Sequence, residues 1–352
     1  MLEVYATQEA LETLVGSRRL MPRWDKLLRV DSFVRIYVDA DAETLNQLML
    51  DNDIDLEEDS EGVMRKIHSS RGDVVLNHPV SIYFPALKKQ AAENIQNQFG
   101  VICQGEDNIV DDDLLSKIHK TVHLGTRSHD WREILSVLKN MPSNALLIND
   151  QYLFSRGREG ADGKIAFPGM RNLRNILDVL LPATFDAKTA YHVIVAINAE
   201  CVKYNPFEKR TLKNCPFTVI SKMIKEEIRS LRHYSTPIQV EVMSVDTSTN
   251  NKEECRLVHD RYILTNYALI DCTHAFDAFD DNGEATYPQD VHVKTIFGEG
   301  IDDDSDMPIE TTDDYRKKFH KYSFRSSPYT INGKQEPFTG IKNRLIQNNS
   351  EE

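Results

Sequence analysis

The residue types best suited to chemistry lie in the segment LVHDRYILTNYALIDCTHAFDAF, residues 257–279. One residue separates His259 from Arg261, and Asn266 follows after four more. Residues two apart on a strand share one face, so an imidazole and a guanidinium at this spacing reach the same ligand. An imidazole can attack phosphorus, and a guanidinium can neutralise phosphoryl oxygens in bidentate geometry. An imidazole and a guanidinium placed in this way are suited to a phosphate ligand.

The spacing His-x-Arg, four residues, Asn resembles the signature of the phospholipase D superfamily, which is His-x-Lys, four residues, Asp. The resemblance implies a catalytic set of His259, Arg261 and Asn266 that needs no metal. An Asn at the third position carries no negative charge, so it would support the imidazole less well than Asp. The spacing alone is a weak signal, because roughly one His-x-Lys/Arg is expected by chance at ordinary lysine and arginine frequencies in a chain with 11 His. A second such pair, His292 and Lys294, is interpreted as a chance match because an acidic segment follows it.

The elements around these residues alternate between strand and helix patterns. Near-continuous apolar runs predict buried strands, and apolar residues at helical spacing predict amphipathic helices. The predicted strands cover 144–150, 191–198, 238–245 and 261–270, and the predicted helices cover 170–182 and 216–234. This order is typical of an α/β layered domain.

The same stretch, about residues 142–280, resembles the C-terminal phospholipase-D-like domain of MIT-domain proteins. In that family an Asp-x-Tyr precedes the first helix, which matches Asp150 and Tyr152. A His-Asp-Arg opens the penultimate strand, which matches residues 259–261, and the ending resembles Phe-Asp-Ala-Phe at 276–279.

The resemblance implies a phospholipase D fold, an α/β/α sandwich, that has lost the full catalytic signature. In the family this domain binds anionic membrane lipid, and Asp150 and Tyr152 are the implied ligand-binding positions. The Gly-Arg-Gly turn of the family is replaced here by residues 273–275, Thr-His-Ala. Low hydrophobicity and the lack of a basic amphipathic helix make nucleic acid or another polyanion the favoured ligand over membrane lipid.

Residues 1–140 predict a separate mixed α/β domain of unknown role. Strand patterns cover 32–39 and 79–84, a helix pattern covers 86–99, a short strand follows at 100–104, and a helix begins within 111–120. No motif of known chemistry lies in this half of the chain. The overall fold class is therefore predicted to be α/β, with the phospholipase-D-like domain at 141–298, an acidic linker at 299–314 and a basic, aromatic tail at 315–352.

The net charge of −13 argues against a protein that coats nucleic acid indiscriminately. Two segments are nevertheless basic: residues 201–232 carry eight Lys/Arg against three Glu, and residues 315–344 carry eight against one. From these segments the predicted ligand-binding residues are Lys203, Lys209, Arg210, Arg316, Lys317 and Lys318. In the tail, aromatic residues interleave with the cations, a pattern that can stack bases and pair phosphates.

Three functions are consistent with these patterns. The favoured one is a degenerate phospholipase-D-like module that binds a phosphate-containing ligand. The second is a metal-independent phosphodiesterase or nuclease, such as a defence effector, which would need a homodimer to supply a second His259. The third is a scaffold that engages protein partners through its acidic segments. The five cysteines include no CxxC pair, so we expect reduced thiols, a cytoplasmic protein, no metal and no cofactor.

Overall fold

The computed structural model divides the chain into two compact units, residues 1–116 and 117–352. This boundary lies before the predicted one at residue 140, because the strand at His119–Leu124 pairs within the second unit. The residues that the structure describes are 2–16, 34–51, 67–69, 81–105, 119–125, 130–155, 157–159, 165–187, 190–198, 204–205, 210–211, 217–245, 260–296, 311–317, 330–331, 334–335 and 345.

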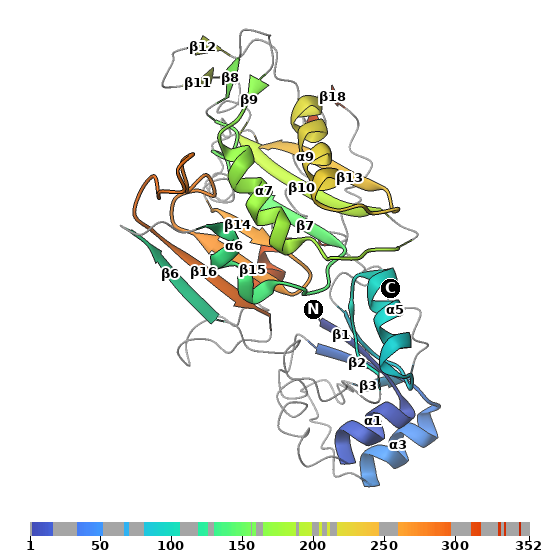
Figure 1. Ribbon diagram of the computed structural model, residues 1–352. Helices are drawn as coiled ribbons and strands as arrows, with labels where there is room; N and C mark the ends of the chain where they lie inside the picture. Colours follow the sequence, from blue (N-terminus) through green and yellow to red (C-terminus); the bar gives the residue numbers. More distant parts are fainter. Residues whose placement is uncertain are drawn as a thin grey trace. The chain divides into compact units, whose positions relative to one another are not determined.

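The first unit is built on a five-stranded parallel sheet with the strand order β3-β2-β1-β4-β5. Helices follow three of these strands along the chain (Figure 1). The elements are β1 (Leu2–Thr7), α1 (Gln8–Gly16), β2 (Val34–Asp39), α3 (Ala42–Asp51), β3 (Ile67–Ser69), β4 (Ser81–Phe84), α5 (Lys89–Phe99) and β5 (Ile102–Cys103). An all-parallel sheet with crossover helices is the arrangement expected of an α/β domain.

Strand β2 shows why these residues form a sheet with a buried face. Ile36 and Val38 are fully buried, Tyr37 between them is half-buried, and the flanking Arg35 and Asp39 are exposed. This alternation is the period-two pattern of a strand with one covered face. Helix α5 ends at Gly100, whose φ of 64° is left-handed and whose N–H donates to the Gln96 carbonyl, as in a common helix C-cap.

The second unit is built on a seven-stranded mixed sheet with the order β13-β10-β7-β14-β15-β16-β6. Strands β13, β10 and β7 are parallel, and the four strands from β14 to β6 are antiparallel to their neighbours. The strands are β6 (His119–Leu124), β7 (Ala145–Asn149), β10 (Tyr191–Asn198), β13 (Ile238–Val245), β14 (Tyr262–Leu264), β15 (Ala268–Cys272) and β16 (Gln289–Thr295). The sheet thus has a parallel half and an antiparallel half that meet between β7 and β14.

Three helices cover one face of this sheet (Figure 1). They are α6 (Trp131–Ile134), followed by the short 3-10 helix η1 (Ser136–Leu138), then α7 (Gly169–Leu180) and α9 (Phe217–Leu231). On α7 the buried positions Leu173, Ile176, Leu177 and Leu180 form the apolar stripe predicted from the sequence. Together with the alternate inward residues of the strands, they form one continuous hydrophobic core.

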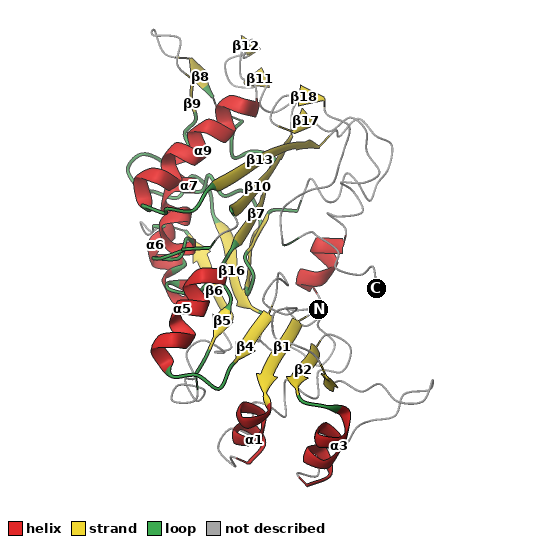
Figure 2. Cartoon of the chain, turned by 90° about the vertical axis from the view of Figure 1, so that its right-hand side faces the viewer, coloured by secondary structure: helices red, strands yellow, loops and turns green. Residues whose placement is uncertain are grey.

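A helical stretch at 311–317 lies on the opposite side of the sheet (Figure 2). Its Tyr315 ring stacks on the buried Tyr262 ring of β14, with centroids 4.1 Å apart. Residues of the predicted acidic linker and basic tail therefore form one helix that packs on the sheet. Short two-stranded ribbons complete the described part: β8 (Arg158–Glu159) with β9 (Ile165–Ala166), β11 (Tyr204–Asn205) with β12 (Arg210–Thr211), and β17 (Thr330–Ile331) with β18 (Lys334–Gln335).

The α/β fold class predicted from the sequence is confirmed, with two local corrections. The predicted single strand at 261–270 is the hairpin of β14 and β15, because the chain turns at Thr265–Tyr267. Of the region predicted to start a helix at 111–120, residues 111–118 lie outside the described residues, and residues 119–120 begin strand β6. Of the helices in the described part of the chain, none has the length and hydropathy needed to cross a membrane.

Candidate functional site

Asp150, Tyr152 and Arg261 meet at the carboxyl end of β7. Asp150 directly follows β7, and Arg261 directly precedes β14, whose first residue, Tyr262, pairs with Asn149. The parallel strands β10 and β13 end at the same edge of the sheet. In α/β sheets this is the edge at which ligands bind.

Asp150 is a fully buried carboxylate that anchors the backbone on both sides of this edge. One oxygen accepts a hydrogen bond from the Tyr152 N–H at 2.8 Å, and the other accepts one from the Phe276 N–H at 2.7 Å. Burial raises the pKa of Asp150 to about 6, although these backbone donors and the nearby Arg261 guanidinium favour the charged form. Asp150 therefore fixes the segment after β7 to the segment after β15.

The Arg261 guanidinium lies over the Tyr152 ring, 5.1 Å from the ring centroid. This is a cation–π contact, which orients a cation without neutralising its charge. Arg261 is half-buried, Tyr152 is 37% exposed, and the Arg261 carbonyl accepts a hydrogen bond from the Cys272 N–H at 3.2 Å. The cation is thus held in place at a part of the edge that a ligand can reach.

Gln289 binds the backbone of the turn at residues 273–275. This turn is at the position of Gly-Arg-Gly in the family that the sequence resembles. The Oε1 atom of Gln289 accepts hydrogen bonds from the N–H groups of His274 and Ala275, at 3.1 and 3.2 Å, and its Nε2 donates to the Ala275 carbonyl. With Asp150 binding the Phe276 N–H, three successive backbone donors of this turn are engaged by side chains of the protein. Sequence reasoning missed Gln289, because a single glutamine at a strand start carries no periodic signal.

Asn266, predicted to act beside Arg261, lies at the opposite end of β7. Its Oδ1 accepts from the Asn144 N–H and its Nδ2 donates to the Asn144 Oδ1, both at 2.9 Å. Asn144 precedes β7 and Asp150 follows it, so these two positions are roughly 20 Å apart at the usual strand rise of about 3.3 Å per residue. Asn266 is fully buried, and the structure gives it a role in packing the strand ends.

Arg316 is buried rather than displayed in a basic tail. It is 8% exposed, and its Nη2 lies 3.4 Å from the Asn266 carbonyl, to which it donates. Burial lowers its pKa to about 10. Lys317 is exposed, and its Nζ forms an ion pair with Asp313 Oδ2 at 2.8 Å. The prediction that Arg316 offers its charge to a ligand is therefore corrected.

The side chains of the remaining predicted site residues lie outside the described part of the structure. His259, Lys203, Lys209 and Lys318 lie outside the described residues. Arg210 begins β12, opposite Asn205, and is described by its backbone. In the parts of the chain that the structure covers, no three His, Cys, Asp or Glu side chains are grouped as metal ligands would be.

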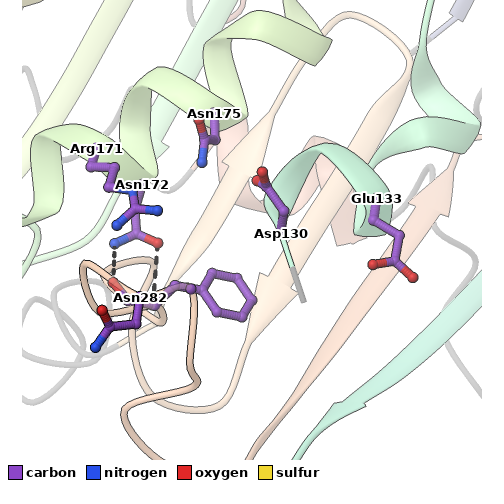
Figure 3. Close-up of a pocket in the computed structure, with 8 residues that line it drawn as sticks. Asp130, Glu133, Arg171, Asn172, Asn175 and Asn282 are labelled. Carbon is purple, nitrogen blue, oxygen red and sulfur yellow. Dashed lines mark hydrogen bonds between the residues drawn. The ribbon is translucent and has the colours of Figure 1, made fainter. Parts of the chain in front are cut away.

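A pocket with a volume of about 330 Å³ opens between α6, α7 and the loop after β15. Sequence reasoning did not find it, since its residues come from three segments without a common motif. Figure 3 shows the side chains that surround it. They are Asp130, Glu133, Arg171, Asn172, Asn175, Phe279, Asn282 and Gly283.

Comparison of the chain with protein-family models and with curated proteins finds no significant match.

Proposed function

We propose that the second unit is a degenerate phospholipase-D-like module that binds a phosphate-containing ligand, with nucleic acid as the favoured one. The observation that carries this proposal is the position of Arg261. Its guanidinium is held over the Tyr152 ring, at the carboxyl edge of the sheet, in a half-buried position. A guanidinium oriented in this way can bind phosphate oxygens bidentately.

The chain supplies further positive charge after a neighbouring strand. Strand β10 ends at the same edge as β7, and the segment that follows it contains Lys203, Lys209 and Arg210. Sequence-independent binding of nucleic acid depends on such cations, because each phosphate contact releases a counterion. Asp150 lies close enough to Arg261 for the two charges to interact, and both of its oxygens are bound by backbone N–H groups.

The turn at residues 273–276 favours binding over catalysis. Backbone N–H groups that stabilise a transferring phosphoryl group must be free to donate to it. In this turn the donors of His274, Ala275 and Phe276 are bound by Gln289 and Asp150. Phosphate recognition would therefore rest on side chains, and His259, two residues before Arg261, is the second candidate group.

The test is a titration of labelled single-stranded and double-stranded DNA and RNA in excess EDTA. We expect Arg261→Gln to weaken binding roughly tenfold, since a charge-assisted hydrogen bond contributes about 1.5–3 kcal/mol. The slope of log affinity against log salt should fall by about 0.7–0.9 for one lost phosphate contact. The matched control is Arg229→Gln, an equal charge change on the exposed side of α9.

Equal losses in Arg261→Gln and Arg229→Gln would show that the sheet edge is not the binding site. Cleavage that persists in EDTA and disappears in His259→Ala would establish the nuclease alternative instead. No binding of any nucleic acid, together with capture of a protein partner, would favour the scaffold.

A further inference from the structure

The pocket between α6, α7 and the loop after β15 is a second site in the same unit. Its volume of about 330 Å³ lies at the lower end of the usual range for small-ligand sites, about 300–1,000 Å³. The lining residues do not include Asp150, Tyr152 or Arg261. What it binds is therefore a separate question from the phosphate site at the sheet edge.

The inner wall of the pocket is preorganised by Asn172, which is 2% exposed. Its Oδ1 accepts hydrogen bonds from the Phe279 N–H at 3.2 Å and the Trp131 Nε1–H at 3.0 Å. Its Nδ2 donates to the Phe279 carbonyl at 2.9 Å. The Trp131 ring, fully buried, meets the Phe279 ring edge-on with centroids 5.6 Å apart. A wall fixed by several hydrogen bonds and ring contacts loses little entropy when a ligand binds.

The charge around the pocket is negative. Asp130 and Glu133 line it from α6, and Asp280 and Asp281 lie in the adjoining loop. Arg171 is the one cation among the described lining residues. Its Nη1 donates to the Asp280 carbonyl at 3.0 Å and lies 3.9 Å from Asp281 Oδ1. Its charge is thus directed toward the loop, and the site as a whole favours a cationic ligand.

A carboxylate and a side-chain amide line the pocket from two elements. Figure 3 shows Asp130 at the start of α6 and Asn175 on α7, with the Asn175 amide nitrogen on the pocket side. The Asn175 side chain makes no hydrogen bond with any residue that the structure describes. Asp130 Oδ1 accepts from the Arg132 N–H at 3.1 Å, while Oδ2 is 3.8 Å from Arg132 Nη1 and can accept a stronger bond. A planar guanidinium carries five N–H donors in a fork and can bridge a carboxylate and an amide oxygen.

We propose that this pocket binds a guanidinium cation. Asp130 forms the ion pair, and Glu133 adds to the negative potential. The Asn175 amide turns about its last side-chain bond, so that its oxygen accepts a second hydrogen bond. The Phe279 ring, 9% exposed, supplies the apolar surface on which the methylene stem of an arginine-like ligand packs. A free guanidinium compound and an arginine side chain of a partner polypeptide share this chemistry.

The test is calorimetric titration of the full chain with N-acetyl-arginine amide and with N-acetyl-citrulline amide, its neutral isostere. We expect the arginine compound to bind in the millimolar range and the citrulline compound to bind at least tenfold more weakly. Asp130→Asn should weaken arginine binding at least fivefold while keeping the helix N-cap, because Asn caps as well as Asp. Asn175→Asp should tighten it, since a second carboxylate then faces the cation.

Glu226→Gln is the matched control, because Glu226 pairs with Lys222 on α9 and does not line the pocket. Arg261→Gln should also leave arginine binding unchanged, which separates this site from the phosphate site. Equal binding of the arginine and citrulline compounds, no binding of either at 100 mM, or unchanged binding in both Asp130→Asn and Asn175→Asp would overturn the proposal. Tighter binding of an arginine-containing hexapeptide than of agmatine would identify a polypeptide as the source of the guanidinium, and the reverse order would identify a small molecule.

Discussion

Asp150 has no exposed surface, yet it joins two segments that are far apart in the sequence. Its carboxylate accepts hydrogen bonds from the N–H groups of Tyr152 and Phe276. Phe276 is 126 residues away from Asp150 in the sequence. The folded protein holds the Asp150 proton more tightly than the unfolded chain, because burial raises the pKa from near 4 to about 6. The stability that Asp150 contributes is therefore fully present below about pH 4 and is lost as the pH rises through about 6.

This linkage predicts a pH effect that Asp150→Asn removes. Between pH 4.5 and pH 7 the free energy of unfolding of the wild-type protein should fall by roughly 2 kcal/mol relative to that of the variant. Urea unfolding at the two pH values measures both, with Glu226→Gln as a control that should follow the wild type. A constant difference between wild type and Asp150→Asn would show that Asp150 stays charged throughout.

Asn266 and Asn144 test whether the third residue of the predicted catalytic set is structural. Because each amide bonds the other residue at 2.9 Å, Asn266→Ala should lower the free energy of unfolding by about 1–3 kcal/mol. Asn144→Ala should lower the free energy of unfolding by a similar amount. The double variant should lose less than the sum of the two single losses, as expected for interacting residues. Nucleic-acid affinity of the folded Asn266→Ala protein should be unchanged, and a loss equal to that of Arg261→Gln would contradict this assignment.

At the scale of elements, the helix at 311–317 buries Arg316, a residue predicted to bind a ligand with its charge. Arg316 is buried against the turn between β14 and β15, and among the described residues its Nε has no hydrogen-bond partner. Replacing a buried, partly satisfied cation by an apolar side chain of similar length is often neutral or stabilising. Arg316→Met should therefore leave nucleic-acid affinity unchanged and raise the melting temperature or leave it as it is. A fall in affinity in this variant would restore the predicted binding role of the segment.

The long periodic elements were predictable because burial imposes a period on them. Strand β10 occupies the predicted residues 191–198, and α7 falls within one or two residues of its predicted ends. The hairpin of β14 and β15 was predicted as one strand, because both halves of 261–270 are apolar and the turn contains neither Gly nor Pro. Strand β6 was missed, since an acidic run before it favours a helix start.

The candidate sites were likewise predictable only in part. Asp150, Tyr152 and Arg261 were singled out through a resemblance to a family, and the structure brings them together. The pocket depends on the contact between Asn172 and the backbone of Phe279, 107 residues away. Such a contact leaves no pattern in either segment. Sequence reasoning could not place those residues side by side.

For the whole molecule, the unit boundary at residue 116 predicts how the chain can be divided. A fragment of residues 117–352 keeps β6 and Trp131, whose fully buried ring packs on Phe276. A fragment that begins at the predicted boundary, residue 141, lacks both and exposes the edge of β16. Unpaired sheet edges promote aggregation. The longer fragment should be monodisperse with a cooperative melting transition, and the shorter one should aggregate, as size-exclusion chromatography and circular dichroism will show. Equal behaviour of the two fragments would place β6 outside the cooperative unit.

The pairing of β6 with β16 also sets an order of events during synthesis. The contact between His123 and Asp290 spans 167 residues, and the chain elongates at about 5–20 residues per second. Strand β6 must therefore wait for roughly ten seconds or more after it leaves the ribosome before its partner strand exists. The parallel strands and the β14–β15 hairpin are complete earlier, so the last step in assembling the sheet is the pairing of its first strand, β6, with β16. Hydrogen exchange of nascent chains should find the β6 amides protected after those of β7 and β10.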